Sequence, residues 1–551
     1  MALPTPLEAF SKKYLRGVFA TYPARAATMG LHGYDGMVTD YGPSAIARRV
    51  SDLKVFRDEL ATIAPDAPPA LAWLDYEMLR LAIDRELFEW ETLRDWARNP
   101  MSYIAACDVS TYLKRNYAPL PARLKAITAY LSHIPGLLAQ ARANLELPMP
   151  RTFAQTSLEM IHGTVVFLRG ELPASLTSVE DAALMSRFSD AQAKAIAALE
   201  SFAAWLRDEV LPKADDQYAI GAEAFRQMLR VGEAVELPLE KLLAVAQTDL
   251  ARNKAEVEAT ARQIAPDRPP GQVARDMTHQ HPSAADLVPT AQKMMEKLRA
   301  FIVERDLVSI PYDLQPVIAE TPSFLRLGFA MMDTPGAFEK VATESFYYIT
   351  LPEKDWSDAQ VEEWLSAFDY YSLDDTSIHE GWPGHYLHWL HFRNSPTQVT
   401  KTFETYTFSE GWAHYVEQMM IEEGYREGDP RLRLAQLAGA LLRDVRFICA
   451  IGMHTQGMSV DEATRRFVQD VYMEELPARK EAERGAYDPG YLAYTLGKLM
   501  TLKLREDYRR EQDSARSASL KQFHDAFLSF GAPPIPFVRK MMLRHDDGQI
   551  L

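Results

Sequence analysis

The sequence predicts an all-α protein, mainly helical, with a short β element beside the functional residues. Apolar residues recur at helical spacing over long stretches of the 551-residue chain, and signals of the capping-box type precede several of them. One short segment rich in aromatic and β-branched residues departs from this pattern. Together, these observations favour helices packed on helices around a large core.

In chain order, the first clear helical pattern runs from Leu71 to Leu87, and Leu242 to Leu250 repeats it. Prolines and a glycine crowd the stretch from Gln263 to Pro282, which predicts a loop. Ser283 and Asp286 then have the spacing of a capping box before another apolar run. A helix is therefore expected to begin close to Ser283.

The second half of the chain contains the one predicted strand. Pro311 to Pro322 is expected to be irregular, and Ser345 to Leu351 is typical of a short strand. Phe403 to Glu422 has a long helical pattern, and Ser459 with Glu462 forms a further capping box. The simplest organisation is an N-terminal helical part, residues 1–340, and a C-terminal catalytic part, residues 341–551, which could form one continuous domain.

Composition excludes several classes of function. The net charge of −16 argues against nucleic acid or an anionic membrane surface as a partner. The two cysteines lie far apart in sequence, which is typical of a protein without disulfides. No segment has the length of a membrane span, and the first twenty or so residues do not have the unbroken apolar stretch of a signal peptide. A cytoplasmic location is therefore expected.

Two motifs indicate a divided metal site: His379-Glu380-Gly381-Trp382-Pro383-Gly384-His385 and Glu410-Gly411-Trp412-Ala413-His414-Tyr415. A zinc hydrolase uses three imidazole or carboxylate ligands and leaves a position for water. His379, His385 and Glu410 can supply this set, and nitrogen and oxygen ligands in this number favour one Zn²⁺ per chain. Glu380 is then placed to act as general base.

The spacing of the two histidines requires a break in the helix. Two histidines four residues apart share a helix face, whereas His379 and His385 are six apart and would diverge on a straight helix. Pro383 and Gly384 supply a kink or bulge that can bring them together. The alternative is that these histidines only occupy a polar helix face. A di-iron bundle is disfavoured, because its Glu-x-x-His pairs have a spacing of three and occur twice.

Further candidates are assigned to supporting roles. His414 shares a helix face with Glu410, so it is expected to support the ligands or to replace His385. His388 is expected to act behind the ligands or to lie at the surface, as is His391. The candidates for substrate binding are Tyr348, Tyr491, Arg443 and Arg446, although basic residues on helices are usually solvated.

The motifs, extended to Ile378–Tyr386 and Ser409–Tyr415, resemble those of the large bacterial family DUF885. The resemblance includes Ala27–Gly36, Gly452–Gly457 and Tyr494–Gly497, and so covers nearly the whole chain. The family is similar in overall build to thimet oligopeptidase and angiotensin-converting enzyme. The resemblance therefore implies a zincin-like helical metallopeptidase with a deep central cleft.

The resemblance also implies roles for individual residues: ligands at His379, His385 and Glu410, the base at Glu380, and stabilisation of the transition state by His454 and Tyr494. Ala450 stands where many members have an aspartate four residues before the histidine, which weakens the assignment of His454.

The leading hypothesis is a zinc-dependent peptidase acting on short peptides, as an oligopeptidase or in a carboxypeptidase-like manner. A zinc amidase acting on a small metabolite would use the same residues, so the sequence leaves that alternative open. A catalytically silent peptide-binding protein is the second alternative. The predicted strand at Phe346–Leu351 is expected to pair with an extended peptide as an edge strand.

Overall fold

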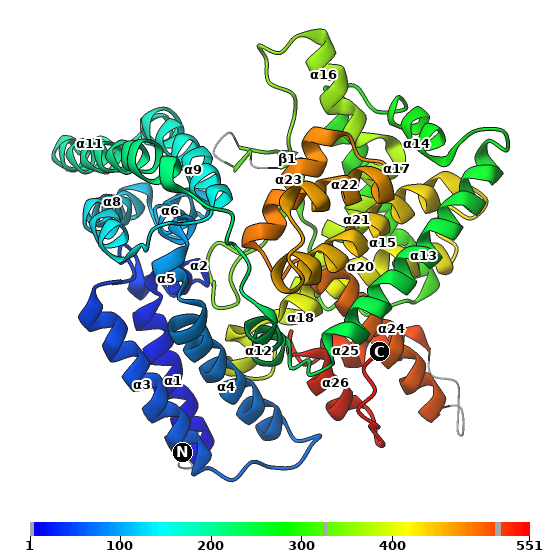
Figure 1. Cartoon of the computed structure of the whole chain (residues 1–551), viewed down its shortest axis with the longest axis horizontal. Coiled ribbons are helices and arrows are strands. Elements are labelled where there is room, and N and C mark those ends of the chain that lie inside the picture. The colour runs from blue at the N-terminus through cyan, green and yellow to red at the C-terminus, as the bar shows by residue number, and fades with distance from the viewer. Residues whose placement is uncertain (1–4, 323–324, 327, 513–518) are drawn as a thin grey trace. The chain divides into compact units, whose positions relative to one another are not determined.

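The computed structural model describes residues 5–322, 325–326, 328–512 and 519–551, and most of these residues lie in helices (Figure 1). The mainly helical prediction is therefore confirmed. The chain forms two compact units. The N-terminal unit comprises Met1–Asp66, Asp75–Ile220 and Pro335–Thr343, and the C-terminal unit comprises Ala67–Leu74, Gly221–Thr334 and Glu344–Leu551. This division differs from the single boundary expected at residue 340, because α13 packs against α21 and α15 against α17 within the C-terminal unit.

The α-helices that lie in the N-terminal unit, or mostly in it, are α1 (Pro6–Thr21), α2 (Pro23–Thr28), α3 (Pro43–Ala61), α4 (Leu71–Leu87), α5 (Asp95–Arg98), α6 (Pro100–Ala105), α7 (Thr111–Lys114), α8 (Leu120–Asn144), α9 (Arg151–Arg169), α10 (Glu171–Ala174) and α11 (Ala182–Trp205). Apolar faces of α8, α9 and α11 meet in its core, where Leu124, Ile161 and Leu199 are buried. The helix predicted from Leu71 to Leu87 is α4.

The α-helices of the C-terminal unit are α12 (Ala222–Glu233), α13 (Leu239–Ile264), α14 (Pro270–Thr278), α15 (Leu287–Arg305), α16 (Asp358–Leu365), α17 (Tyr370–Glu380), α18 (His385–Phe392), α19 (Gln398–Thr402), α20 (Tyr406–Glu422), α21 (Pro430–Thr455), α22 (Val460–Val471), α23 (Glu475–Tyr487), α24 (Ala493–Gln512), α25 (Leu520–Leu528) and α26 (Ile535–Met542). Short 3-10 or π-type turns span His32–Tyr34, Phe88–Leu93, Leu206–Val210, Leu211–Lys213 and Ser366–Phe368.

Local signals set several helix starts. Ser459 and Glu462 form the predicted capping box of α22. Ser283 and Asp286 do bond to each other, but α15 begins only after Asp286. The loop expected between Gln263 and Pro282 was wrong in part, since Pro270 begins α14.

The sheet contains three strands in the part of the chain that the structure describes: β1 (Val317–Glu320), β2 (Ala330–Asp333) and β3 (Phe346–Ile349). The strand predicted from Ser345 to Leu351 is β3, whereas β1 and β2 were missed. The order is β1-β3-β2, with β1 parallel and β2 antiparallel to β3. Since β3 is central, it cannot be the edge strand that was expected to pair with a peptide. β2 is an edge of this sheet.

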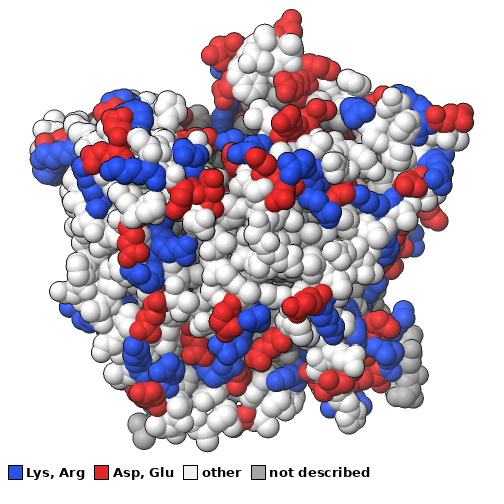
Figure 2. Space-filling model, in the orientation of Figure 1, with Lys and Arg blue, Asp and Glu red and all other residues white. Residues whose placement is uncertain are grey.

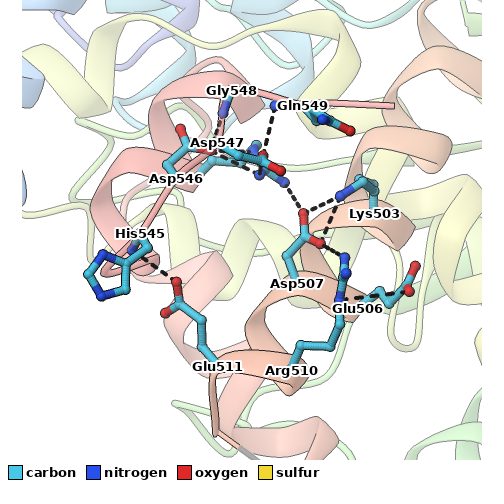
Figure 3. Close-up of polar contacts among 11 residues, drawn as sticks. Lys503, Glu506, Asp507, Arg510, Glu511, His545, Asp546, Asp547, Gly548 and Gln549 are labelled. Atoms are coloured by element: carbon cyan, nitrogen blue, oxygen red, sulfur yellow. Dashed lines mark hydrogen bonds and ion pairs between the residues drawn. The ribbon is translucent and has the colours of Figure 1, made fainter.

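Charged residues of both signs are interspersed over the visible face (Figure 2). Many form exposed ion pairs, such as Lys13 with Glu59. The chain after α26 is held to α24 by hydrogen bonds and ion pairs (Figure 3). For example, the carboxylate of Glu511 on α24 accepts hydrogen bonds from the backbone N–H groups of Arg544 and His545 at 3.0 and 2.9 Å. Among the described residues, no helix is long and apolar enough to cross a membrane.

A buried carboxylate joins three helices of the N-terminal unit. Glu86, on α4, accepts three hydrogen bonds from the Arg49 guanidinium of α3 at 2.6, 2.7 and 3.0 Å, and one from the Tyr14 hydroxyl of α1 at 2.7 Å. Arg49 is only 5% exposed. Removing the carboxylate would therefore leave a buried cation without its partner.

We expect Glu86→Ala to lower the free energy of opening of α1 and α3, measured by amide hydrogen exchange, by about 3–5 kcal/mol. The matched control is Glu59→Ala, which removes the exposed partner of Lys13 and is expected to cost less than about 1 kcal/mol. Equal effects of the two substitutions would contradict this account.

Candidate metal centre

The two motifs meet in the C-terminal unit, where α17 and α18 lie beside α20. α17 ends at Glu380 and α18 begins at His385, so the predicted break is a complete interruption rather than a kink. Gly384 makes this break possible, because a Cβ atom there would lie 1.8 Å from the carbonyl oxygen of His379. No residue with a side chain fits this close approach. The rings of His379 and His385 consequently lie 4.8 Å apart, centroid to centroid.

The second motif is fixed against the first by aromatic and glycine contacts. The buried indole of Trp412 donates a hydrogen bond to the Pro383 carbonyl at 2.9 Å, which joins α20 to the break. On another side, Gly411 of α20 meets Gly497 of α24, and a Cβ atom on Gly411 would lie 2.5 Å from the Gly497 backbone. These contacts place Glu410 next to the two histidines.

The carboxylate of Glu410 faces both histidines. Its Oε2 atom lies 3.4 Å from Nε2 of His379 and 3.4 Å from Nε2 of His385. This oxygen is buried without a hydrogen-bond partner. Donors that surround a zinc ion tetrahedrally, at bond lengths of about 2.0–2.1 Å, are about 3.3–3.4 Å apart. The spacing of the three side chains therefore fits a zinc ion.

Glu380 is a competing third ligand. His379, Glu380 and His385 each offer an atom, and these atoms lie within 4.8 Å of one another. However, Oε2 of Glu380 already accepts the Met332 backbone N–H at 3.0 Å, from β2. Glu410 places one oxygen, which forms no hydrogen bond, 3.4 Å from Nε2 of both histidines, so Glu410 is the stronger candidate for the third ligand.

Behind His379 lies Glu417, which sequence analysis missed. Its fully buried carboxylate is 2.6 Å from Nδ1 of His379 and 2.8 Å from Nδ1 of His414, and it forms an ion pair of 3.0 Å with Arg443. A carboxylate on the far nitrogen fixes the tautomer and orientation of a ligating histidine. One signal was present: Glu410, His414 and Glu417 have helical spacing on one face of α20.

The charges of this cluster depend on one another. Burial raises the pKa of the Glu410 carboxyl, but His385 and His379 lower it well below its usual range. Burial lowers the pKa of His379, but the neighbouring carboxylates of Glu410 and Glu417 raise it to about 10. Two carboxylates beside one imidazole thus favour positive charge at this position, and a bound metal ion would also supply it.

Burial disfavours the charged form of the two supporting histidines, His414 and His388. Burial, together with Lys498, lowers the pKa of His414 to about 3. Burial also lowers the pKa of His388 to about 3, and its ring packs against Phe408. His414 thus contacts the cluster through Glu417, while His388 lies in an aromatic environment on α18.

Tyr494 lies beside the metal-site cluster of His379, His385 and Glu410. Its ring is 6.5 Å from that of His379, and its hydroxyl is 3.5 Å from that of Tyr406. Arg484 donates to the Tyr406 hydroxyl at 2.9 Å. Tyr406 and Arg484 were not predicted, because neither belongs to a motif.

Arg443 and Arg446, which were predicted to bind substrate, have partners within the protein. Arg443 pairs with Glu417, and Arg446 forms two hydrogen bonds of 2.8 Å with Glu481. Both guanidinium groups also lie over the Tyr494 ring. Arg443 therefore stabilises Glu417, and both arginines position the Tyr494 ring. Neither guanidinium is placed to bind a substrate.

The two tyrosines predicted to bind substrate, Tyr491 and Tyr348, are buried. Tyr491 is fully buried, and its hydroxyl packs so closely on Gly485 that a Cβ atom there would lie 2.2 Å away. Tyr348 is 6% exposed. It alternates with Tyr347, whose hydroxyl contacts Ser377 of α17, so Tyr348 faces the opposite side of the sheet. Neither residue supports the predicted role.

His454 lies apart from Arg443, the residue of α21 that contacts His379. His454 is about three turns, or about 16 Å, further along α21 than Arg443. Its Nε2 atom is 2.8 Å from the Gly485 carbonyl oxygen on α23. This bond assigns His454 to the packing of α21 on α23, in contrast to the predicted role in the transition state.

Comparisons with known proteins support the fold. A family model described as "Bacterial protein of unknown function (DUF885)" matches residues 23–542. A "putative lipoprotein of unknown function" from Shewanella oneidensis has a similar structure, with a TM-score of 0.83 and 22% identity, covering 98% of this chain and 100% of that one. A "putative lipoprotein" from Colwellia psychrerythraea has a TM-score of 0.81 and 16% sequence identity, and the match covers 98% of this chain and 99% of that one. No curated protein matches the chain.

Proposed function

The chain belongs to the DUF885 family of bacterial proteins, and we propose that it is a zinc-dependent peptidase that cleaves short peptides. The observation that carries the proposal is the buried Oε2 atom of Glu410, which forms no hydrogen bond and lies 3.4 Å from Nε2 of both His379 and His385. A buried carboxylate oxygen facing two imidazoles is the donor set of a hydrolytic zinc site. A zinc ion held there would supply Lewis acidity, which activates water and polarises a carbonyl group.

The side chains around the site support the remaining steps. Glu380 is proposed to take a proton from the attacking water and to pass it to the leaving amine. The Met332 N–H group holds one of its oxygens at 3.0 Å, which fixes the carboxylate beside the histidines. Tyr494, steadied by the two arginines over its ring, is proposed to donate a hydrogen bond to the oxygen on which negative charge develops.

Peptide binding is assigned to β2 instead of β3. In an antiparallel pair, alternate residues direct their backbone groups away from the partner strand. Met332 directs its N–H group away from β3, toward Glu380, so the outer edge of β2 runs beside Glu380. An extended peptide that pairs with this edge would pass beside Glu380. The proposal includes the deep cleft implied by the resemblance, since a cleft would admit short peptides and exclude folded proteins.

The test is to strip the protein of metal, reload one portion with zinc, and incubate both portions with a diverse pool of short peptides. Mass spectrometry should detect cleavage by the reloaded portion alone, with about one zinc bound per chain. A portion reloaded with Mg²⁺ is the control, because magnesium prefers oxygen ligands. Zinc binding without cleavage of any peptide would overturn the peptidase and favour an amidase. Absence of zinc binding would overturn the metal site. The cytoplasmic location stays a prediction.

A further inference from the structure

The chain passes from one unit to the other and back within the β2–β3 connection. β2 and β3 belong to the C-terminal unit, but Pro335–Thr343, between them, belongs to the N-terminal unit. Only Asp333 and Thr334 separate this segment from Met332. The backbone N–H group of Met332 donates the hydrogen bond to Glu380. We call Pro335–Thr343 the inserted loop.

The inserted loop is fitted closely to the N-terminal unit. A Cβ atom on Gly336 would lie 2.3 Å from Cα of Met29, and one on Gly30 would lie 2.4 Å from the Glu339 nitrogen. The Phe338 N–H group donates to the Met29 carbonyl at 2.9 Å. Two glycines therefore allow backbone to meet backbone, and a shift of the loop would break this fit.

A polar cluster fastens the loop at Glu339. His32 has Nε2 2.8 Å from the Glu339 carboxylate and Nδ1 3.2 Å from that of Asp35. Its ring stacks on Tyr117 at 3.5 Å, and Tyr117 donates to Asp35 at 2.7 Å. The Glu339 side chain is 4% exposed and that of His32 is 27% exposed, so this contact is partly shielded from water.

Glu339 also holds the shape of the loop. Its second oxygen accepts the backbone N–H groups of Lys340, Val341 and Ala342, at 2.8, 2.7 and 3.2 Å. One carboxylate thus both closes a turn of the inserted loop and binds His32. The motif Ala27–Gly36, which the metal site does not use, supplies the other side of the contact.

We propose that His32 and Glu339 are positioning residues: they hold the inserted loop in one conformation and so order β2, the strand joined directly to it, and through Met332 the carboxylate of Glu380. This inference rests on the proposed function for the role of Glu380. The link is short: Glu339 closes the loop, the loop begins three residues after Met332 in β2, and the Met332 N–H group donates to Glu380. The zinc ligands lie on α17, α18 and α20, outside this link.

The experiment compares full-length wild type, His32→Ala and Glu339→Gln, with His133→Ala as matched control, because His133 is an exposed residue of α8 in the same unit. Hydrogen exchange of residues 330–333, zinc affinity by chelator competition, and kcat and KM for a cleaved peptide are measured for each. His32→Ala and Glu339→Gln should speed exchange in β2 about tenfold. They should lower kcat/KM roughly 10- to 100-fold, with a fall in kcat, and leave zinc affinity unchanged.

The double variant separates positioning from general damage. The double variant His32→Ala, Glu339→Gln should have nearly the same kcat/KM and β2 exchange rate as either single variant, because both substitutions remove the same contact. Faster exchange across the N-terminal unit with β2 unchanged would overturn the inference and leave a structural role only. Unchanged kcat with unchanged β2 exchange would also overturn it. If the wild type cleaves no peptide, the proposed function fails, while exchange in β2 still decides whether His32 and Glu339 fix that strand.

Discussion

Replacing Glu380 with glutamine is expected to lower kcat/KM for peptide cleavage about 10³-fold while the protein still binds zinc. A positioned general base typically accelerates proton transfer reactions of this kind by about 10²–10⁴-fold. Glutamine keeps the size of the side chain and can accept the Met332 N–H bond through its amide oxygen, but it cannot take a proton from water. The measurement combines steady-state kinetics with the zinc content of the purified variant.

The same variant decides which glutamate binds the metal. Glu380→Gln should retain zinc, whereas Glu410→Gln should lose it, because Glu410 has the oxygen that lies 3.4 Å from both histidines and forms no hydrogen bond. The control is Glu363→Gln, an exposed glutamate of α16, which should change neither quantity. Loss of zinc from Glu380→Gln in proportion to activity would make Glu380 a ligand and remove its assignment as base.

The sequence predicted the helical fold and the convergence of the two motifs, because both depend on short-range patterns. Apolar periodicity marked α4 and α13, and the pair Pro383-Gly384 marked the break between α17 and α18. The severity of that break could not be predicted. It depends on how closely Gly384 approaches the His379 carbonyl, which only the folded backbone defines.

Long-range contacts account for what was missed. β1 and β2 have four residues each and find partners only through β3, so neither shows a period of its own. Arg443 and Arg446 looked available for substrate because Glu417 and Glu481, their partners, come from other helices. Tyr491 and His454 were both predicted to act at the site, but the fold uses them for packing around Gly485.

Replacing Glu417 with alanine is expected to weaken zinc affinity about 10- to 100-fold, which is typical of losing a carboxylate behind a ligating histidine. Glu417 bonds to Nδ1 of His379, so it directs the other nitrogen, Nε2, toward Glu410 and His385. Without it, His379 can rotate or adopt the wrong tautomer, and Arg443 loses its buried anion. Chelator competition measures the change in zinc affinity.

Two further variants distinguish orientation from loss of charge. Glu417→Gln keeps an oxygen that can accept from His379, so it should recover part of the affinity lost in Glu417→Ala. Glu422→Gln, an exposed position on the same helix, should bind zinc like the wild type. Wild-type affinity in Glu417→Ala would show that His379 needs no partner at Nδ1. Equal losses in the Ala and Gln variants would show that the charge of Glu417, rather than its hydrogen bond, stabilises the bound metal.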